Sequence, residues 1–356
     1  MLKGKFSLVL VFSLLIFTSH FLVNAQVEIK TSKTVSEKSE AERLFNEGWD
    51  LIKLKKYKEA AVIFEKVVQL NPQQKGAYTN LSWMYLEQGR FEDAAAAARK
   101  EIEFNPTSSM AHNNLGFALT QLGKYDEAYG ELKKAIELDA DNTKAHVNLG
   151  FAYRSAGRYD DAVAALQQLT KLKPDYAEGF GNLFSAAMMA NNREIALEAG
   201  IKYAELKPED VNAQNMLGAA YMNTGKYPEA AAAFEKSVAL KPDDVMSLRN
   251  LGKALTVAGQ PDRALEIFKK AAALKPGDFD SYYDLAMASS AAKKFTDAIE
   301  YLKQAVAIKP DSVPALMGLG HTYMAVGNRE AALEQYEILK KLDSVAADIL
   351  LKRINK

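Results

Sequence analysis

The chain has 356 residues, of which 48% are hydrophobic and 25% are charged, and this composition is typical of a folded protein rather than a disordered one. It carries 45 basic and 45 acidic residues, so it lacks the basic excess of a nucleic-acid-binding protein. It has no cysteine, which excludes disulfide bonds, thiol nucleophiles and cysteine-ligated metals.

The first 25 residues have the pattern of a secretory signal peptide. Lys3 and Lys5 precede an apolar stretch over residues 6–17, and residues 23–25 read Val-Asn-Ala, a small-residue cleavage signal. A transmembrane anchor is the alternative, but the apolar stretch is shorter than the about 20 residues that a span needs. We expect cleavage after Ala25, which would leave an exported chain, periplasmic or secreted, without a stable membrane anchor.

The remainder of the chain repeats itself every 34 residues. The segment Asn-Leu-Gly-Phe-Ala stands at residues 114–118 and again at 148–152, and Leu-Lys-Pro stands at 240–242 and again at 274–276. Nine copies fit over residues 41–346 without an insertion. A fixed period of this length indicates a repeat architecture in which each unit packs on its neighbours.

Four positions within the repeat carry a restricted type of residue. The twentieth is alanine in all nine copies, the eighth is small in eight, the fifteenth is glycine in six and the thirty-second is proline in seven. Small residues allow two helices to touch closely, glycine supplies the left-handed residue that ends a helix, and proline prevents helix continuation. Each copy is therefore predicted to be a hairpin of two antiparallel helices, each of about 12–14 residues.

This pattern resembles the tetratricopeptide repeat family over residues 41–346. The resemblance implies an all-α fold, a right-handed α-solenoid whose first helices line a concave groove and whose second helices form the convex back. We expect residues 26–40 to be a flexible polar lead and residues 347–356 to form a short C-terminal capping helix. Exported arrays without disulfides resemble periplasmic ones, so a bacterial envelope is the expected setting.

The fifth copy departs from the pattern. Phe184 occupies the eighth position, where other copies have a small residue, and Gly200 stands where a large residue is usual. Asn191 and Asn192 replace the turn glycine. We interpret the change as a compensated exchange of large and small side chains, with a local weak point or bend as the alternative.

The sequence offers no catalytic constellation. The segments outside the repeats are too short for a catalytic domain, and there is no glycine-rich phosphate loop or serine-centred elbow. His112 and His146 occupy the same position in neighbouring copies, but a metal shared between them would lack a third ligand. We expect both to be buried and hydrogen-bonded, in a non-enzymatic protein without a metal or cofactor.

By the family resemblance, positions two, five, six, nine, twelve and thirteen of each first helix face the groove. The sixth position is asparagine in six copies: Asn46, Asn80, Asn114, Asn148, Asn182 and Asn250. An amide both donates and accepts hydrogen bonds, so such a ladder can pair with a peptide backbone. Asparagine is also common at this position in the family, so the ladder alone does not establish a binding site.

The ninth position is aromatic in the first four copies only, as Trp49, Trp83, Phe117 and Phe151, and these include both tryptophans of the chain. Aromatic side chains are frequent binding anchors, although each ring could instead pack on the next repeat. Further along the groove lie Met188, Met189 and Met222. Methionines suit an adaptable binding surface, and they also fill irregular gaps.

The sequence therefore predicts a protein–protein interaction module that binds peptide segments in the concave groove. A structural scaffold of an envelope complex, docking through the convex face or the ends of the array, is the alternative. Glycan binding through aromatic rings and groove amides is a minor alternative. No nucleic-acid partner is expected.

Overall fold

The computed structural model describes residues 34–355, and the expected signal peptide lies outside them. Within the described residues the secondary structure consists of α-helices joined by short turns, with no strand, so the predicted all-α fold is confirmed. None of the helices found there is long and apolar enough to cross a membrane.

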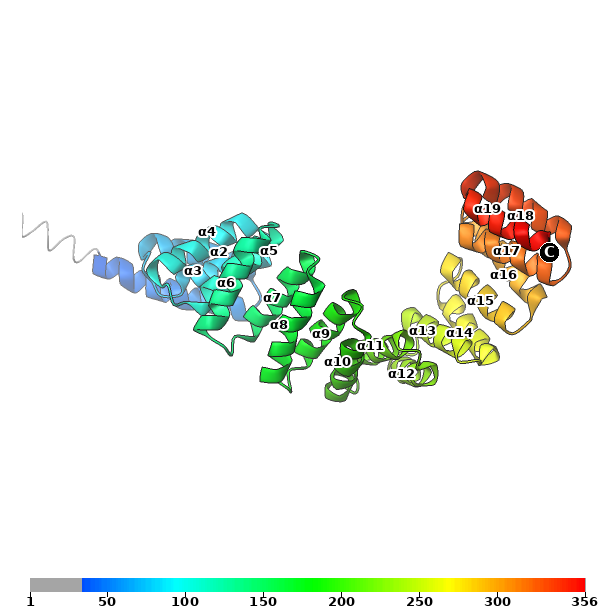
Figure 1. The fold of residues 1–356 in the computed structure, drawn as a ribbon. Helices are drawn as coiled ribbons and strands as arrows, with labels where there is room; N and C mark the ends of the chain where they lie inside the picture. The colour runs from blue at the N-terminus through cyan, green and yellow to red at the C-terminus, as the bar shows by residue number, and fades with distance from the viewer. Residues whose placement is uncertain (1–33, 356) are drawn as a thin grey trace, which may run out of the picture. The chain divides into compact units, whose positions relative to one another are not determined.

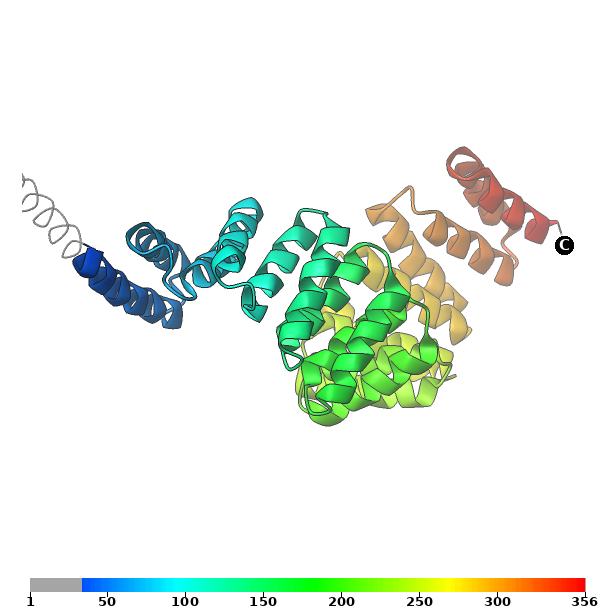
Figure 2. The ribbon, with the colours of Figure 1, turned by 60° about the vertical axis from the view of Figure 1, so that its left-hand side comes forward.

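The chain forms two compact units, here called the N-terminal unit, up to Ala165, and the C-terminal unit, from Leu166. The first described element of the N-terminal unit is a helix over residues 34–53. It continues with α2 (Tyr57–Leu70), α3 (Ala77–Glu87), α4 (Phe91–Phe104), α5 (Ser109–Gln121), α6 (Tyr125–Leu138) and α7 (Thr143–Ser155), in chain order (Figures 1 and 2). Helix α8 (Tyr159–Leu172) spans the boundary. Each helix from α2 to α7 packs on the next along the chain.

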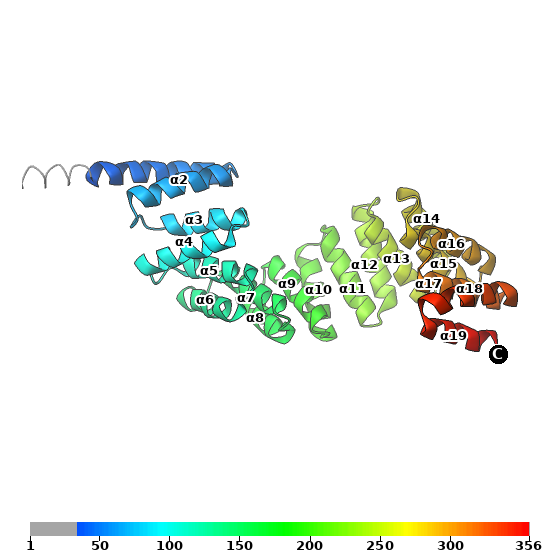
Figure 3. The ribbon, with the colours of Figure 1, turned by 90° about the horizontal axis from the view of Figure 1, so that it is seen from above.

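The C-terminal unit continues the same arrangement. Its helices are α9 (Ala177–Met189), α10 (Arg193–Leu206), α11 (Val211–Asn223), α12 (Tyr227–Leu240), α13 (Val245–Val257), α14 (Pro261–Leu274), α15 (Phe279–Ala291), α16 (Phe295–Ile308), α17 (Val313–Ala325), α18 (Arg329–Leu342) and α19 (Ser344–Ile354). Figure 3 shows α9 to α13 side by side in this order. Each helix from α9 to α19 packs on the next.

The turn inside each hairpin has the backbone geometry that the glycine pattern predicts. Glycines at the fifteenth position have φ between 70° and 77°. In the copies without glycine, Lys55, Asn191 and Lys293 adopt φ values of 58°, 54° and 59° at the same position. The left-handed residue is therefore a property of the turn, and three copies accept a side chain there despite its steric cost.

The restricted small residues lie where the two helices of a hairpin touch. All the alanines at the twentieth position are fully buried: Ala60, Ala94, Ala128, Ala162, Ala196, Ala230, Ala264, Ala298 and Ala332. A Cβ atom placed on Gly218 would lie 2.6 Å from the Phe234 ring, and one on Gly116 would lie 2.5 Å from Leu132. These distances are too short for a non-bonded contact, which confirms the predicted close approach of the helices.

The first helices of successive hairpins also pack on one another. In the N-terminal unit α3 contacts α5 and α5 contacts α7, and in the C-terminal unit α9, α11, α13, α15 and α17 form a similar series. One face of each unit is thus built from first helices, and this is the face on which the family resemblance places the binding groove. The right-handed superhelix and the count of nine repeats stay predictions.

The two ends differ from the expected boundaries. Residues 34–40 are helical, although a flexible lead was predicted there, and Arg43 pairs with Glu40 at 2.8 Å in this first helix. At the other end α19 starts at Ser344, before residue 347, because Asp343 accepts a hydrogen bond from the backbone N–H of Ala346 and caps the helix. Leu350 of α19 covers Gly320, so this helix closes the last hairpin.

Candidate functional site

A pocket of about 380 Å³ lies on the first-helix face of the N-terminal unit. Three helices line it: α3 with Trp83, Leu86 and Glu87, α5 with Asn113, Asn114 and Phe117, and α7 with Lys144 and Asn148. Each of these residues falls at one of the six repeat positions that the family resemblance assigns to the groove. The structure therefore brings together four residues singled out from the sequence, namely Trp83, Asn114, Phe117 and Asn148.

The Trp83 side chain is held in place on one edge and faces a cation. Its indole Nε1 donates a hydrogen bond to Oε1 of Glu87, one helical turn away, at 2.9 Å. The Lys144 Nζ atom lies 5.5 Å from the centre of the Trp83 ring, within the range of a cation–π interaction. Tyr57 packs on Trp83 with ring centres 6.3 Å apart. The pocket wall therefore presents an oriented aromatic ring between two charges of opposite sign.

The asparagines of the pocket form a chain of hydrogen bonds. Asn148 donates from Nδ2 to Oδ1 of Asn113 at 2.8 Å, Asn113 donates to Oδ1 of Asn114 at 3.4 Å, and Asn114 donates to the Thr79 carbonyl at 3.2 Å. Each amide nitrogen carries a second N–H, and the Asn148 carbonyl oxygen ends the chain as an acceptor. Asn113 and Asn114 are only 7% and 6% exposed, so they serve to orient Asn148. Asn148 is half-buried and keeps its second N–H and its carbonyl oxygen for a ligand.

The other residues predicted for this part of the groove lie differently. Asn80 is only 4% exposed, so its amide is part of the helix packing and is not presented to a ligand. Asn46 and Trp49 are exposed on the helix over residues 34–53, outside the pocket. Phe151 lies next to Phe117 with ring centres 6.0 Å apart, which extends the aromatic surface by one repeat.

The first-helix face of the C-terminal unit has a pocket of about 370 Å³ between α11 and α13. Its lining includes two predicted residues, Met222 and Asn250, together with Ala219, Asn223, Phe234 and Lys253. The amide of Asn182 instead donates to the Glu178 carbonyl in its own helix, at 2.9 Å. Met188 accepts a hydrogen bond from Asn223 at 3.7 Å, and Met189 is exposed. The asparagines at the sixth position are therefore not equivalent, and ligand binding by the ladder stays a prediction.

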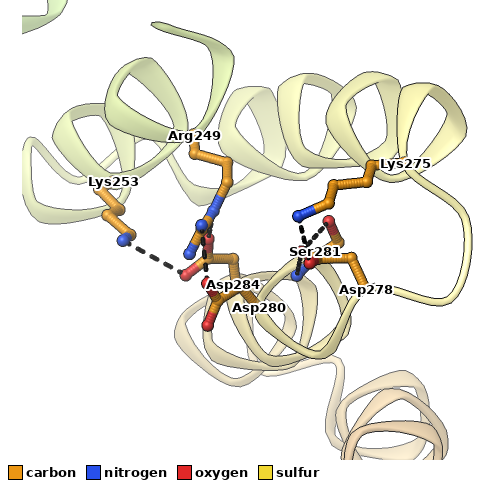
Figure 4. Close-up of polar contacts among 7 residues, drawn as sticks. All are labelled: Arg249, Lys253, Lys275, Asp278, Asp280, Ser281 and Asp284. Atoms are coloured by element: carbon orange, nitrogen blue, oxygen red, sulfur yellow. Dashed lines mark hydrogen bonds and ion pairs between the residues drawn. The ribbon is translucent and has the colours of Figure 1, made fainter. Parts of the chain in front are cut away.

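A charged cluster on the same unit was not singled out from the sequence. Arg249 of α13 donates from Nε to Asp284 of α15 at 2.6 Å and from Nη1 to Asp280 at 3.0 Å, and Lys253 lies 3.7 Å from Asp284 (Figure 4). Burial lowers the pKa of Arg249, but the hydrogen bond and charge of Asp284, with those of Asp280, outweigh burial and raise it. All four residues occupy groove positions, so comparing charges at those positions could have found the cluster.

His112 and His146, which occupy the same position in neighbouring copies, have structural roles. His112 is buried, with Nδ1 2.6 Å from Oε2 of Glu131 and Nε2 3.1 Å from the Pro106 carbonyl. His146 is buried with Nε2 3.1 Å from the Ala140 carbonyl. Both are therefore hydrogen-bonded packing residues, as expected. Residues 34–355 contain no group of three or more side chains suited to a metal ion.

Comparison with protein families identifies the repeat. Three models described as tetratricopeptide repeats match the chain. The first matches residues 119–181 and 289–348, the second 249–313 and the third 211–244. A model described as anaphase-promoting complex, cyclosome, subunit 3, matches residues 53–135. No match was found among curated proteins.

Several solved structures are similar to parts of the chain. MamA from Desulfovibrio magneticus RS-1 (residues 41 to the end) is 24% identical with a TM-score of 0.45, and the match covers 48% of this chain and 96% of that one. A further MamA crystal structure is 27% identical with a TM-score of 0.44, over 47% of this chain and 91% of that one. The Cut9–Hcn1 hetero-tetramer is 19% identical with a TM-score of 0.46, over 75% of this chain and 52% of that one.

The chain belongs to the tetratricopeptide repeat family, and its helical hairpins, turn geometry and alanine contacts agree with the family matches. Tetratricopeptide repeat proteins bind protein partners and are generally not enzymes. The family therefore supports a role in protein interaction or as a scaffold.

Proposed function

We propose that the N-terminal unit captures a peptide segment of a partner protein in the pocket formed by α3, α5 and α7. The observation that carries the proposal is the pairing of an apolar wall with the oriented, half-buried amide of Asn148 in one hollow. Trp83 and Phe117 would receive an apolar side chain of the peptide, and Asn148 would pair with its backbone. The volume of about 380 Å³ lies at the lower end of the range of ligand pockets, which suits one or two side chains.

The charges at the pocket refine the expected ligand. Glu87 is engaged by the Trp83 indole, whereas Lys144 has no carboxylate partner among residues 34–355 and lies over the ring. A carboxylate next to the apolar side chain of the peptide would pair with Lys144. We therefore propose that the preferred segment carries an acidic residue beside a large apolar residue.

The proposed role is non-enzymatic, and its setting is outside the cytoplasm. The support for the setting is the signal-peptide pattern of residues 1–25, with two lysines, an apolar stretch and a small-residue cleavage signal. A periplasmic or secreted adaptor without disulfides depends on packing alone for its stability, and the fully buried alanines at the helix contacts serve that purpose.

Affinity capture from envelope extract of the native host tests the proposal. The bait is the tagged chain of residues 26–356, compared with its Trp83→Ala variant and, as the matched control, Trp49→Ala, which removes the other tryptophan outside the pocket. We expect Trp83→Ala to lose the partner, with binding weakened by about 2 kcal/mol, and Trp49→Ala to keep it. A partner that both variants retain would contradict groove capture and favour the scaffold alternative.

A further inference from the structure

A third hollow, of about 390 Å³, lies between two second helices, α8 and α10, with α9 as its floor. The part of α8 that borders it belongs to the C-terminal unit, as do α9 and α10. Its apolar lining comes mainly from Phe180, Leu183, Ile195 and Ile201. This hollow is separate from the first-helix pockets, and the peptide-capture proposal does not use it.

Comparison among the repeats of the chain shows that this hollow is unusual. Ile195 stands at the nineteenth position of its copy, which is charged in seven of the nine copies. Ile201 stands at the twenty-fifth position, which is also charged in seven of the nine copies. At both positions most copies carry a charged side chain, whereas the fifth copy carries a branched apolar side chain that is half-buried at the hollow. Two such replacements on one helix, both at the same hollow, indicate a surface that is covered.

The two sides of the hollow, formed by α8 and by α10, carry net charges of opposite sign. On the α8 side, Lys171 has no ion-pair partner in the described chain. On the α10 side, Lys202 pairs with Glu205 at 3.1 Å, and Glu198 has no ion-pair partner among the described residues. The α8 edge is thus positive by one charge and the α10 edge is negative by one.

We propose that a second copy of this chain covers the hollow, related by a two-fold axis that runs along it between α8 and α10. A two-fold contact uses the same patch on both copies, so the patch must be complementary to itself. This axis places α8 of one copy over α10 of the other. Lys171 of each copy then faces the acidic α10 edge of the other, and Ile195 and Ile201 form a shared apolar centre inside a charged rim.

Sedimentation equilibrium of the purified chain over residues 26–356 tests this proposal. At about 100 µM protein we expect a mass nearer two copies than one, falling toward one copy on dilution. Ile195→Glu combined with Ile201→Lys restores residue types that other repeats carry at these positions, so the fold should persist, and we expect a monomer. Ala331→Glu is the matched control, because it adds a charge at the nineteenth position of another repeat, outside the hollow, and should leave the dimer unchanged.

A charge exchange provides a second test that does not change the apolar centre. Lys171→Glu should weaken the dimer at least tenfold by placing like charges opposite one another, and adding Glu198→Lys should restore most of the loss. A chain that is monomeric at about 100 µM would overturn the proposal. A dimer that persists in the double isoleucine variant would also overturn it, since the copies would then meet through another surface.

Discussion

The Phe184 ring lies against Gly200, so the fifth hairpin places its large side chain on the first helix and its small one on the second. A Cβ atom built on Gly200 would lie 3.5 Å from Cδ2 of Phe184 and 3.4 Å from the Cβ of Ala220. In other hairpins the order is reversed, as with Gly218 beneath Phe234. Phe184 is buried, and α9 and α10 pack like other hairpins of the unit. The compensated exchange is therefore what the structure shows.

Gly200→Ala and Gly218→Ala should have opposite effects on stability. Space for a methyl group exists at Gly200 at ordinary contact distances, and alanine is favoured over glycine in a helix by up to about 1 kcal/mol. At Gly218 the methyl group would meet the Phe234 ring at 2.6 Å, which should cost about 1–3 kcal/mol through overpacking. Thermal unfolding followed by circular dichroism measures both. A loss of stability in Gly200→Ala equal to that in Gly218→Ala would show that the exchange does not create room.

The pair formed by Arg249 and Asp284 should stabilise the contact between α13 and α15. Asp284→Ala would leave the half-buried guanidinium with Asp280 only, and we expect a loss of about 2 kcal/mol, below the range for fully buried pairs. Asp280→Ala is the matched control, because Asp280 pairs with the same arginine but is exposed, and should cost less than about 1 kcal/mol. Equal losses in denaturant unfolding would contradict the assigned difference in burial.

Asp278 should give α15 a stability that depends on pH. It caps the helix by accepting from the Ser281 backbone N–H at 3.1 Å and from the Ser281 hydroxyl at 3.0 Å, and Lys275 lies 2.8 Å away (Figure 4). The hydrogen bond from Lys275 lowers its pKa below the ordinary 3.8; burial opposes this shift, and the bonds from Ser281 add to it. A lowered pKa means that the stabilisation is complete above about pH 4 and disappears as pH falls through the folded-state value.

The variant Asp278→Asn separates the charge from the cap, because asparagine is also a good capping residue. We expect it to be less stable than the parent at pH 7 and equally stable at the acid end of the titration. Asp311→Asn, which removes an exposed carboxylate next to another helix cap, is the charge-matched control and should change the stability at pH 7 by no more than about 0.5 kcal/mol. A difference between Asp278→Asn and the parent that stays constant with pH would contradict the linkage.

Export should remove the first 25 residues. Expression of the full chain in a bacterial host, followed by cell fractionation and N-terminal sequencing, should yield a soluble envelope protein that starts at Gln26. Replacing Ala25 with a bulky residue should slow this processing. A chain that retains Met1 in the cytoplasm would overturn the proposed setting while leaving peptide capture untouched.

Much of the fold could be predicted from the 34-residue period of the sequence. A tight hairpin requires a small residue at the twentieth position and a left-handed residue at the fifteenth. These requirements are local, so they leave the same pattern in each copy of the repeat. The structure agrees at Ala60 and at Gly89, and also at Lys55, where no glycine marks the turn. The helical residues 34–40 differ from the predicted flexible lead, because Glu37 and Glu40 are polar residues that also suit a helix.

The candidate site was predictable only in part. Repeat positions correctly grouped Trp83, Phe117 and Asn148 on one surface. They could not show that Asn80 is buried or that Asn182 bonds to its own helix, because the direction of an amide depends on carbonyls and side chains of neighbouring turns and repeats. The hollow between α8 and α10 does not follow from the small positions of the fifth copy, because Ile195 differs at a position that is charged in most copies.

Tryptophan fluorescence tests peptide capture by the N-terminal unit most directly. The chain has two tryptophans, so the Trp49→Phe variant reports on Trp83 alone. A synthetic peptide taken from the captured partner, with its apolar and acidic residues adjacent, is titrated into this variant while calorimetry records binding. We predict a saturable shift of the Trp83 emission to shorter wavelength, with the same dissociation constant as calorimetry, and a weaker affinity for the peptide whose acidic residue is replaced by alanine. Calorimetric binding without any change in the emission of Trp83 would contradict the account.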